Sequence, residues 1–185
     1  MSTHFAPLSP DTAPPAARPM LLGSQSQFGF VPSPVAKAAA SPVALKHLLA
    51  GFAAFDQSSL SPIEREVVAM TVAFENGCHY CMALHSALLA PTEPALVTAL
   101  RAGTPLADER LEALRLFARA ITQTRARPDA DAWRAFEAAG YTEANALDVV
   151  LGVGVYVLST YLNLLTESEL DAPFQPFAWQ KPPAA

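Results

Sequence analysis

A succession of helix-start and helix-stop signals between residues 41 and 166 limits what this chain can fold into more than any other feature. Ser41-Pro42 and Ser61-Pro62 each place a capping side chain before a proline at the first helical position. Glu64 completes a capping box with Ser61, and Asn76-Gly77 is a left-handed stop. The expected helices begin near residues 42, 62, 78, 93, 108, 129 and 142. No alternating strand pattern competes with them, so the sequence predicts an all-α fold.

The 185-residue length suits one domain with flanking segments. Residues 1–41 are rich in Pro, Ala and Ser without a sustained helical period, and they predict an extended arm. Apolar residues in this arm, among them Phe28 and Phe30, indicate that it packs on the domain or on a neighbouring subunit. A helical domain is expected over residues 42–170, followed by an irregular, proline-rich tail over residues 171–185.

The composition and net charge limit the kinds of partner that this chain can have. With 51% hydrophobic and 16% charged residues, the chain is more apolar than an average soluble domain, which predicts apolar surface buried between subunits of a homo-oligomer. A net charge of −5 and the absence of a basic cluster argue against a nucleic-acid partner. The N-terminal segment lacks the pattern of a secretory signal, so a cytoplasmic location is expected.

Residues 149–165 form the most membrane-like stretch of the sequence. Small and polar residues interrupt it, and it is shorter than the roughly 20 apolar residues of a membrane span, so a buried helix and no membrane contact are expected. Gly152 and Gly154 lack the strand context of a dinucleotide fingerprint and instead indicate close helix packing. No cofactor is expected.

Three residues with redox or acid–base chemistry share one helix face. Cys78, Cys81 and His85, at spacings i, i+3 and i+7, fall within a sector of about 60°. The two cysteines are close enough to form a reversible disulfide, and the helix terminus favours a thiolate on Cys78. His85, four residues after Cys81, is expected to exchange the proton of that thiol. His79 and Tyr80 are candidates for the mouth of the site.

Glu66 is the fourth candidate, because it lies at the edge of an apolar helix stripe. That stripe comprises Ile63, Val67, Met70 and Phe74. A carboxylate in such a place needs a partner, and His85 on the next helix is the expected one. Burial is expected to raise the pKa of Glu66 toward a value useful for proton relay.

The combined spacing is more specific than a Cys-x-x-Cys pair alone. Glu66, eleven intervening residues, Cys78-x-x-Cys81, three more residues and His85 resemble the signature of the alkylhydroperoxidase D (AhpD) and carboxymuconolactone decarboxylase superfamily, over about residues 40–165. The resemblance implies an AhpD-like helical bundle, a homo-oligomer that is a dimer, a trimer or a hexamer, and peroxidase activity regenerated by a dithiol donor. It further implies that Cys81 attacks the peroxide, Cys78 resolves the product, and Glu66 and His85 relay protons.

One position departs from the family pattern. The best-known peroxidase members carry a histidine immediately before the second cysteine, where this chain has Tyr80, and its nearest histidine is His79. The departure leaves the rate of turnover and the use of peroxide open.

The sequence therefore predicts a thiol-dependent, peroxidase-like oxidoreductase of the peroxiredoxin type, without a metal. Its nucleophile is expected to be Cys81, with an exposed Cys78 meeting the dithiol donor. The alternatives are a redox sensor that does not turn over, and a structural zinc site made by the two cysteines, His85 and Glu66. Three ligands on one helix cannot easily surround a single ion, which argues against zinc.

Overall fold

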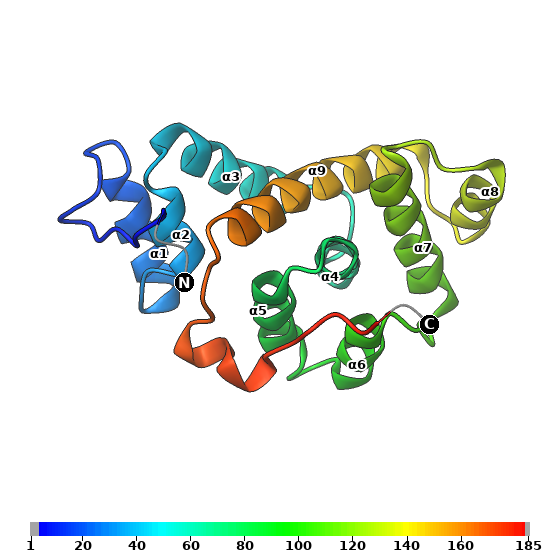
Figure 1. Cartoon of the computed structure of the whole chain (residues 1–185). Coiled ribbons are helices and arrows are strands. Elements are labelled where there is room, and N and C mark those ends of the chain that lie inside the picture. Colours follow the sequence, from blue (N-terminus) through cyan, green and yellow to red (C-terminus); the bar gives the residue numbers. More distant parts are fainter. Residues whose placement is uncertain (1–3, 184–185) are drawn as a thin grey trace.

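The computed structural model describes residues 4–183, and within that range it contains helices and no β-strand. In chain order the elements are α1 (Arg18–Phe28), α2 (Ser33–Ala38), α3 (Pro42–Phe55), α4 (Pro62–Asn76), α5 (His79–Leu89), α6 (Pro94–Ala102), α7 (Glu109–Thr124), α8 (Ala130–Ala138), α9 (Glu143–Leu165) and the 3₁₀ helix η1 (Ala172–Phe177) (Figure 1). The predicted all-α class is confirmed.

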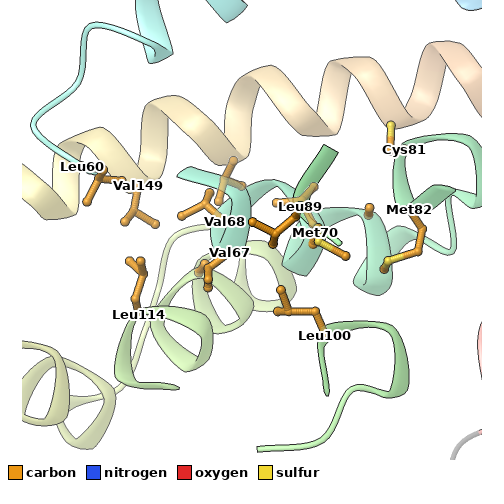
Figure 2. Packing of buried hydrophobic residues seen from close by; sticks show 14 of the residues in the cluster. Leu60, Val67, Val68, Met70, Cys81, Met82, Leu89, Leu100, Leu114 and Val149 are labelled. Carbon is orange, nitrogen blue, oxygen red and sulfur yellow. The ribbon is translucent and has the colours of Figure 1, made fainter. Parts of the chain in front are cut away.

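Helix α4 forms the centre of the bundle, with α5, α6, α7 and α9 packed around it (Figure 1). Every side chain from Val67 to Ala73 is buried, so burial extends over all faces of this helix. Figure 2 shows Val67, Val68 and Met70 among apolar side chains contributed by the surrounding helices. The apolar stripe predicted for this helix is therefore narrower than the surface that is actually buried. Its first member, Ile63, is exposed.

The capping signals act as the sequence predicts. The Ser61 amide donates to Glu64 Oε2 at 2.7 Å, and the Glu64 amide donates to Ser61 Oγ at 3.3 Å, which completes the capping box of α4. Gly77 ends that helix with φ of 67°, a left-handed conformation that glycine adopts without steric cost. The chain turns there and enters α5 directly.

The N-terminal arm is not extended as predicted, because it contains α1 and α2. Pro19 opens α1 and Gly29 closes it with a left-handed φ of 81°. The arm packs on the helical domain: Lys37 Nζ donates to the carbonyl oxygens of Thr166 and Glu167 at the end of α9. These partners lie more than a hundred residues away in the chain, so the sequence shows no periodic signal for them.

The C-terminal segment is likewise more ordered than the predicted irregular tail, since it forms η1 and then crosses α5 toward α6 (Figure 1). Arg101 Nη1 donates to the Phe177 carbonyl at 3.0 Å, and Trp179 Nε1 donates to the Arg101 carbonyl at 2.9 Å. The segment therefore closes over the bundle. The last two residues of the predicted tail, 184 and 185, lie outside the described range.

Helix α9 is long and apolar enough to cross a membrane by length and composition, with a mean hydropathy of 1.6. Its 23 residues correct the expectation that the segment is too short. The core helix of a soluble protein meets the same test, and α9 packs on α3, α4, α5 and α7 along its inner side. Its outer side carries exposed apolar residues, so the helix is only half-buried.

The close packing predicted for the two glycines of α9 holds for Gly152 alone. A Cβ atom on Gly152 would lie 2.5 Å from the ring of buried Phe55 and 3.0 Å from Val68, whereas one on Gly154 meets no atom within 4 Å. Gly152 therefore sets how closely α9 approaches α3 and α4.

Replacing Gly152 by alanine should lower the free energy of unfolding by about 1–3 kcal/mol, the usual result of overpacking a core. Gly23→Ala in α1, where an added Cβ meets nothing within 4 Å, is the control and should be neutral or stabilising by about 0.5–1 kcal/mol. Urea unfolding of the two variants measures the difference. Equal stability of both would contradict the tight contact.

Candidate active site

The two cysteines lie where α4 ends and α5 begins. Cys78 is the N-cap residue of α5, one position earlier than the first helical turn in which the sequence places it. Its sulfur accepts the backbone N–H of Cys81 at 3.5 Å, the role that a serine or aspartate oxygen has at other helix starts. Both thiols are free. The helix terminus therefore supplies a donor to Cys78, as predicted.

Helix α9 forms the opposite wall of the site. Asn163 Nδ2 donates to Cys81 Sγ at 3.1 Å and to Cys78 Sγ at 3.7 Å, and Ser159 Oγ lies 3.7 Å from Cys81 Sγ. Figure 2 shows Cys81 beside the long helix at the edge of the buried cluster. The two sulfur atoms are thus enclosed between α5 and α9.

The two thiols have different acidities. The hydrogen bond from the Cys81 thiol lowers the pKa of Cys78 to about 7 against the opposing effect of burial, and the Cys81 amide and Asn163 lower it further. The same hydrogen bond and burial raise the pKa of Cys81 well above its usual range. The expectation of an exposed Cys78 is wrong: Cys78 is 0% exposed and Cys81 is 4% exposed, because η1 and α9 cover the start of α5.

His85 and Glu66 form the ion pair that the sequence predicts, with 2.7 Å between His85 Nδ1 and Glu66 Oε2. Burial lowers the pKa of His85, but the Glu66 charge and hydrogen bond outweigh burial and leave the pKa raised. For Glu66 the opposite holds: burial raises the pKa, and His85 reverses this to a net lowering. The expected raised pKa of Glu66 is therefore wrong, since its partner is a cation.

His85 does not contact the thiols in the way that its spacing from Cys81 suggests. Among the described residues no hydrogen bond joins His85 to either sulfur, and its ring instead meets the edge of Tyr156 at 5.2 Å between centroids. Helical spacing alone places side chains on a common face without fixing their rotamers.

The two candidates for the mouth of the site bind the C-terminal segment. His79 Nε2 lies 3.0 Å from the carbonyl oxygen of Ser168, and the hydroxyl of buried Tyr80 donates to Asp171 Oδ2 at 2.6 Å. Asp171 Oδ2 also accepts the Ser33 amide at 3.1 Å. Tyr80 thus links α5 to the segment before η1 and, through Asp171, to the arm.

A metal site requires ligands that converge on one point. Within residues 4–183 no three His, Cys, Asp or Glu side chains are grouped so that they could hold a metal ion together. The zinc alternative thus gains no support from the arrangement of Cys78, Cys81, His85 and Glu66.

Sequence reasoning missed Asn163 and Ser159, which touch the sulfur atoms from more than seventy residues away in the chain. The sequence feature that could have identified them is the presence of polar residues in an otherwise apolar helix. Ser159, Thr160 and Asn163 are all buried, and buried polar groups on such a helix need partners.

Comparison with known proteins agrees with this architecture. Residues 43–119 match the carboxymuconolactone decarboxylase family, a range that contains α4, α5 and all four predicted site residues. No curated protein matches the sequence.

Several solved structures share the fold. A peroxidase-related protein with an alkylhydroperoxidase AhpD core from Ralstonia eutropha JMP134 aligns with a TM-score of 0.81 and 21% identity, over 92% of this chain and 93% of its own. A peroxidase-related protein from Silicibacter sp. TM1040 aligns with a TM-score of 0.76 and 22% identity, over 94% and 97%. The debrominase Bmp8, solved with 2,3,4-tribromopyrrole, aligns with a TM-score of 0.75 and 19% identity, over 95% and 96%.

These structures establish the fold, and the family match covers the segment that carries the thiols and the ion pair. Together with the predicted signature, the family match over residues 43–119 and the shared fold support the resemblance to the AhpD-like and carboxymuconolactone decarboxylase superfamily.

Proposed function

We propose that this chain is a thiol-dependent, peroxidase-like oxidoreductase that reduces a hydroperoxide with the Cys78 and Cys81 pair. The observation that carries the proposal is the pair itself: two free, buried thiols share a hydrogen bond, and their pKa values are shifted in opposite directions. A thiolate next to a second thiol is suited to oxidation to a disulfide and to reduction by an external dithiol.

The reaction begins with the thiolate on Cys78 and the proton on Cys81. Cys81 passes its proton to Cys78, and its sulfur attacks the terminal oxygen of the hydroperoxide. The O–O bond breaks as the S–O bond forms, and the departing alkoxide takes the proton of Cys78 to give an alcohol. Cys81 is then a sulfenic acid. Cys78 attacks its sulfur, hydroxide leaves as water with a proton from His85, and an external dithiol later reduces the disulfide.

The assignment of Cys81 as the attacking thiol rests on the surroundings of the two sulfurs. Cys78 Sγ is fully buried and held by donors from Cys81 and Asn163, and such a stabilised, acidic thiolate is a weaker nucleophile. Cys81 Sγ faces Ser159 and Asn163, which can bind an oxygen atom. In this proposal the resting thiolate of Cys78 accepts the proton of Cys81, a role that the sequence predicts for His85.

His85 and Glu66 act as the proton reserve of the site. Because Glu66 keeps its charge and raises the pKa of His85, the imidazolium form of His85 is more populated near neutral pH than in an isolated histidine. The Cys78 charge also raises the pKa of His85. The pair thus favours the anionic sulfur and supplies the proton that the departing hydroxide needs.

A second candidate reaction is reductive dehalogenation, which the similarity to the debrominase Bmp8 over 95% of this chain favours. A cysteine sulfur would attack bromine on an electron-rich ring, and a proton would replace bromine on the carbon. The other cysteine would then displace bromide to form the same disulfide. The thiol pair and the dithiol donor are shared with the peroxidase reaction, so the two candidates differ in substrate alone.

The reductant is a dithiol or a protein thiol, and a cytoplasmic setting, where thiols are kept reduced, fits this cycle. A redox sensor with the same pair would oxidise once and would not turn over.

The homo-oligomer is also a proposal, with a second copy of the chain on the outer side of α9. Six apolar residues are exposed there: Leu147, Val150, Leu151, Tyr161, Leu164 and Leu165. A groove between α3 and α9, lined by His47, Gly51 and Leu158 among others, continues this surface. Residues 149–165 contain no charged side chain, so the surface is suited to pack against its own copy.

The peroxidase proposal predicts different losses for the two cysteine variants. Cys78→Ser should still form a trappable sulfenic acid on Cys81 after peroxide treatment, but more slowly because Cys81 loses its proton acceptor, and it should abolish steady-state turnover with a dithiol. Cys81→Ser should form sulfenic acid at no more than about a hundredth of the wild-type rate, because the attacking sulfur is gone. Trapping with a dimedone probe and mass mapping measures both. Labelling of Cys78 in Cys81→Ser at the wild-type rate would reverse the assignment.

The thiol pKa values predict a pH profile. The ultraviolet absorbance of thiolate in the reduced protein should rise through a midpoint near pH 7, because Cys78 loses its proton there. Cys81 should stay protonated at this pH, because its pKa is raised well above the usual range of a cysteine. Cys81→Ala removes the donor to Cys78, so the midpoint should move upward toward 9.0. A midpoint that stays near 7 in this variant would show that Cys81 does not stabilise the thiolate.

The oligomer proposal predicts that a charge on the outer side of α9 weakens association. Leu151→Glu should shift the protein toward the monomer by at least about tenfold in dissociation constant, because a carboxylate would be buried in the interface. Leu88→Glu on α5, where leucine is also exposed, is the control and should leave association unchanged. Light scattering across a dilution series measures both, and a monomeric wild type at micromolar concentration would refute the oligomer.

A further inference from the structure

The side chain of Asn163 is satisfied on one side only. It is 3% exposed, and its Nδ2 donates to both sulfur atoms. Its Oδ1 is fully enclosed and has no hydrogen-bond partner among residues 4–183. Leaving a buried acceptor unpaired is destabilising, so such groups are few in native proteins.

The neighbouring polar residues of α9 do not share this feature. Thr160 Oγ1 accepts from Asn76 Nδ2 at 2.9 Å and donates to the Val157 carbonyl at 3.0 Å. Thr166 Oγ1 donates to the Leu162 carbonyl at 2.8 Å. On this helix the unpaired acceptor therefore lies at the residue that holds the thiols.

We propose that Asn163 is a catalytic residue that binds the substrate and the nucleophile together. Its Nδ2 holds the Cys81 sulfur, and its Oδ1 accepts the O–H of the hydroperoxide. This proposal rests on the proposed peroxidase function and deepens it, because it names the group that recognises the substrate.

The geometry suits the reaction because both amide atoms are bonded to one carbon. With Nδ2 at 3.1 Å from Cys81 Sγ, an oxygen that donates to Oδ1 lies beside that sulfur. Two fixed partners of this kind reduce the entropy lost in bringing oxygen and sulfur together. After attack, the O–H of the Cys81 sulfenic acid can donate to the same Oδ1, so Asn163 exchanges no atom or electron.

The recognised chemistry is an O–H on the reacting oxygen. Hydrogen peroxide and alkyl hydroperoxides carry it, whereas a methyl thiosulfonate reacts with the same sulfur and has no O–H to donate. The ratio of the two reaction rates therefore isolates the contribution of Oδ1. Any change in thiolate population affects both rates equally and cancels in the ratio.

The experiment uses Cys78→Ser as the parent, in which Cys81 is the single thiol. Rates of reaction with tert-butyl hydroperoxide and with methyl methanethiosulfonate are measured in this parent and after adding Asn163→Ala. The hydroperoxide-to-thiosulfonate ratio should fall about tenfold in Asn163→Ala, the size of one hydrogen bond to a reacting group. Asn76→Ala, which removes another buried contact to α9, is the control and should keep the parent ratio.

Each outcome has a distinct meaning. A ratio in Asn163→Ala equal to that of the parent, or an equal fall in Asn76→Ala, would overturn the role of Oδ1 and leave the peroxidase proposal standing. Wild-type protein that consumes the hydroperoxide with a dithiol no faster than free cysteine would instead overturn the peroxidase proposal, and the role of Asn163 with it. Circular dichroism of all variants establishes that the helices are intact.

Discussion

Burial of the middle of α4 on all of its faces is the constraint on which the rest of the site depends. Because Val67 to Ala73 are covered on every side, the position and rotation of this helix are fixed by α5, α6, α7 and α9 together. Its C-terminal glycine then sets where Cys78 begins α5, and its first half holds Glu66 against His85. Gly152 lets α9 approach closely enough for Asn163 to reach both sulfur atoms. A shift of α4 would therefore disturb the thiols and the ion pair at once.

The parts of the structure that local chemistry determines could be predicted from the sequence. Capping residues and glycine stops located α3 to α9 to within a few residues, and helical spacing placed Cys81 and His85 on one helix, with Cys78 becoming its N-cap residue. The pairing of Glu66 with His85 followed from the cost of leaving a carboxylate in an apolar stripe.

What could not be predicted depends on contacts distant in the chain. The anchoring of the arm by Lys37, the anchoring of Tyr80 by Asp171, and the contact of Asn163 with the thiols join segments separated by about eighty residues or more. The predicted direction of the Glu66 pKa shift was wrong for a related reason. Burial and the charge of its partner shift the pKa in opposite directions, and only the short distance to His85 shows which effect prevails. The pair of thiols, the ion pair of His85 and Glu66 and the α9 wall are assembled by tertiary packing from locally predictable helices.

In the proposed cycle, the Cys78 and Cys81 pair accepts the two oxidising equivalents of a peroxide as one disulfide. Intact mass measurement of the reduced protein after one equivalent of hydroperoxide tests this most directly. We expect the loss of two hydrogens per chain, reversed by a dithiol, with the Cys78 and Cys81 peptides joined. An unchanged mass, or oxygen added elsewhere while both thiols remain free, would contradict it.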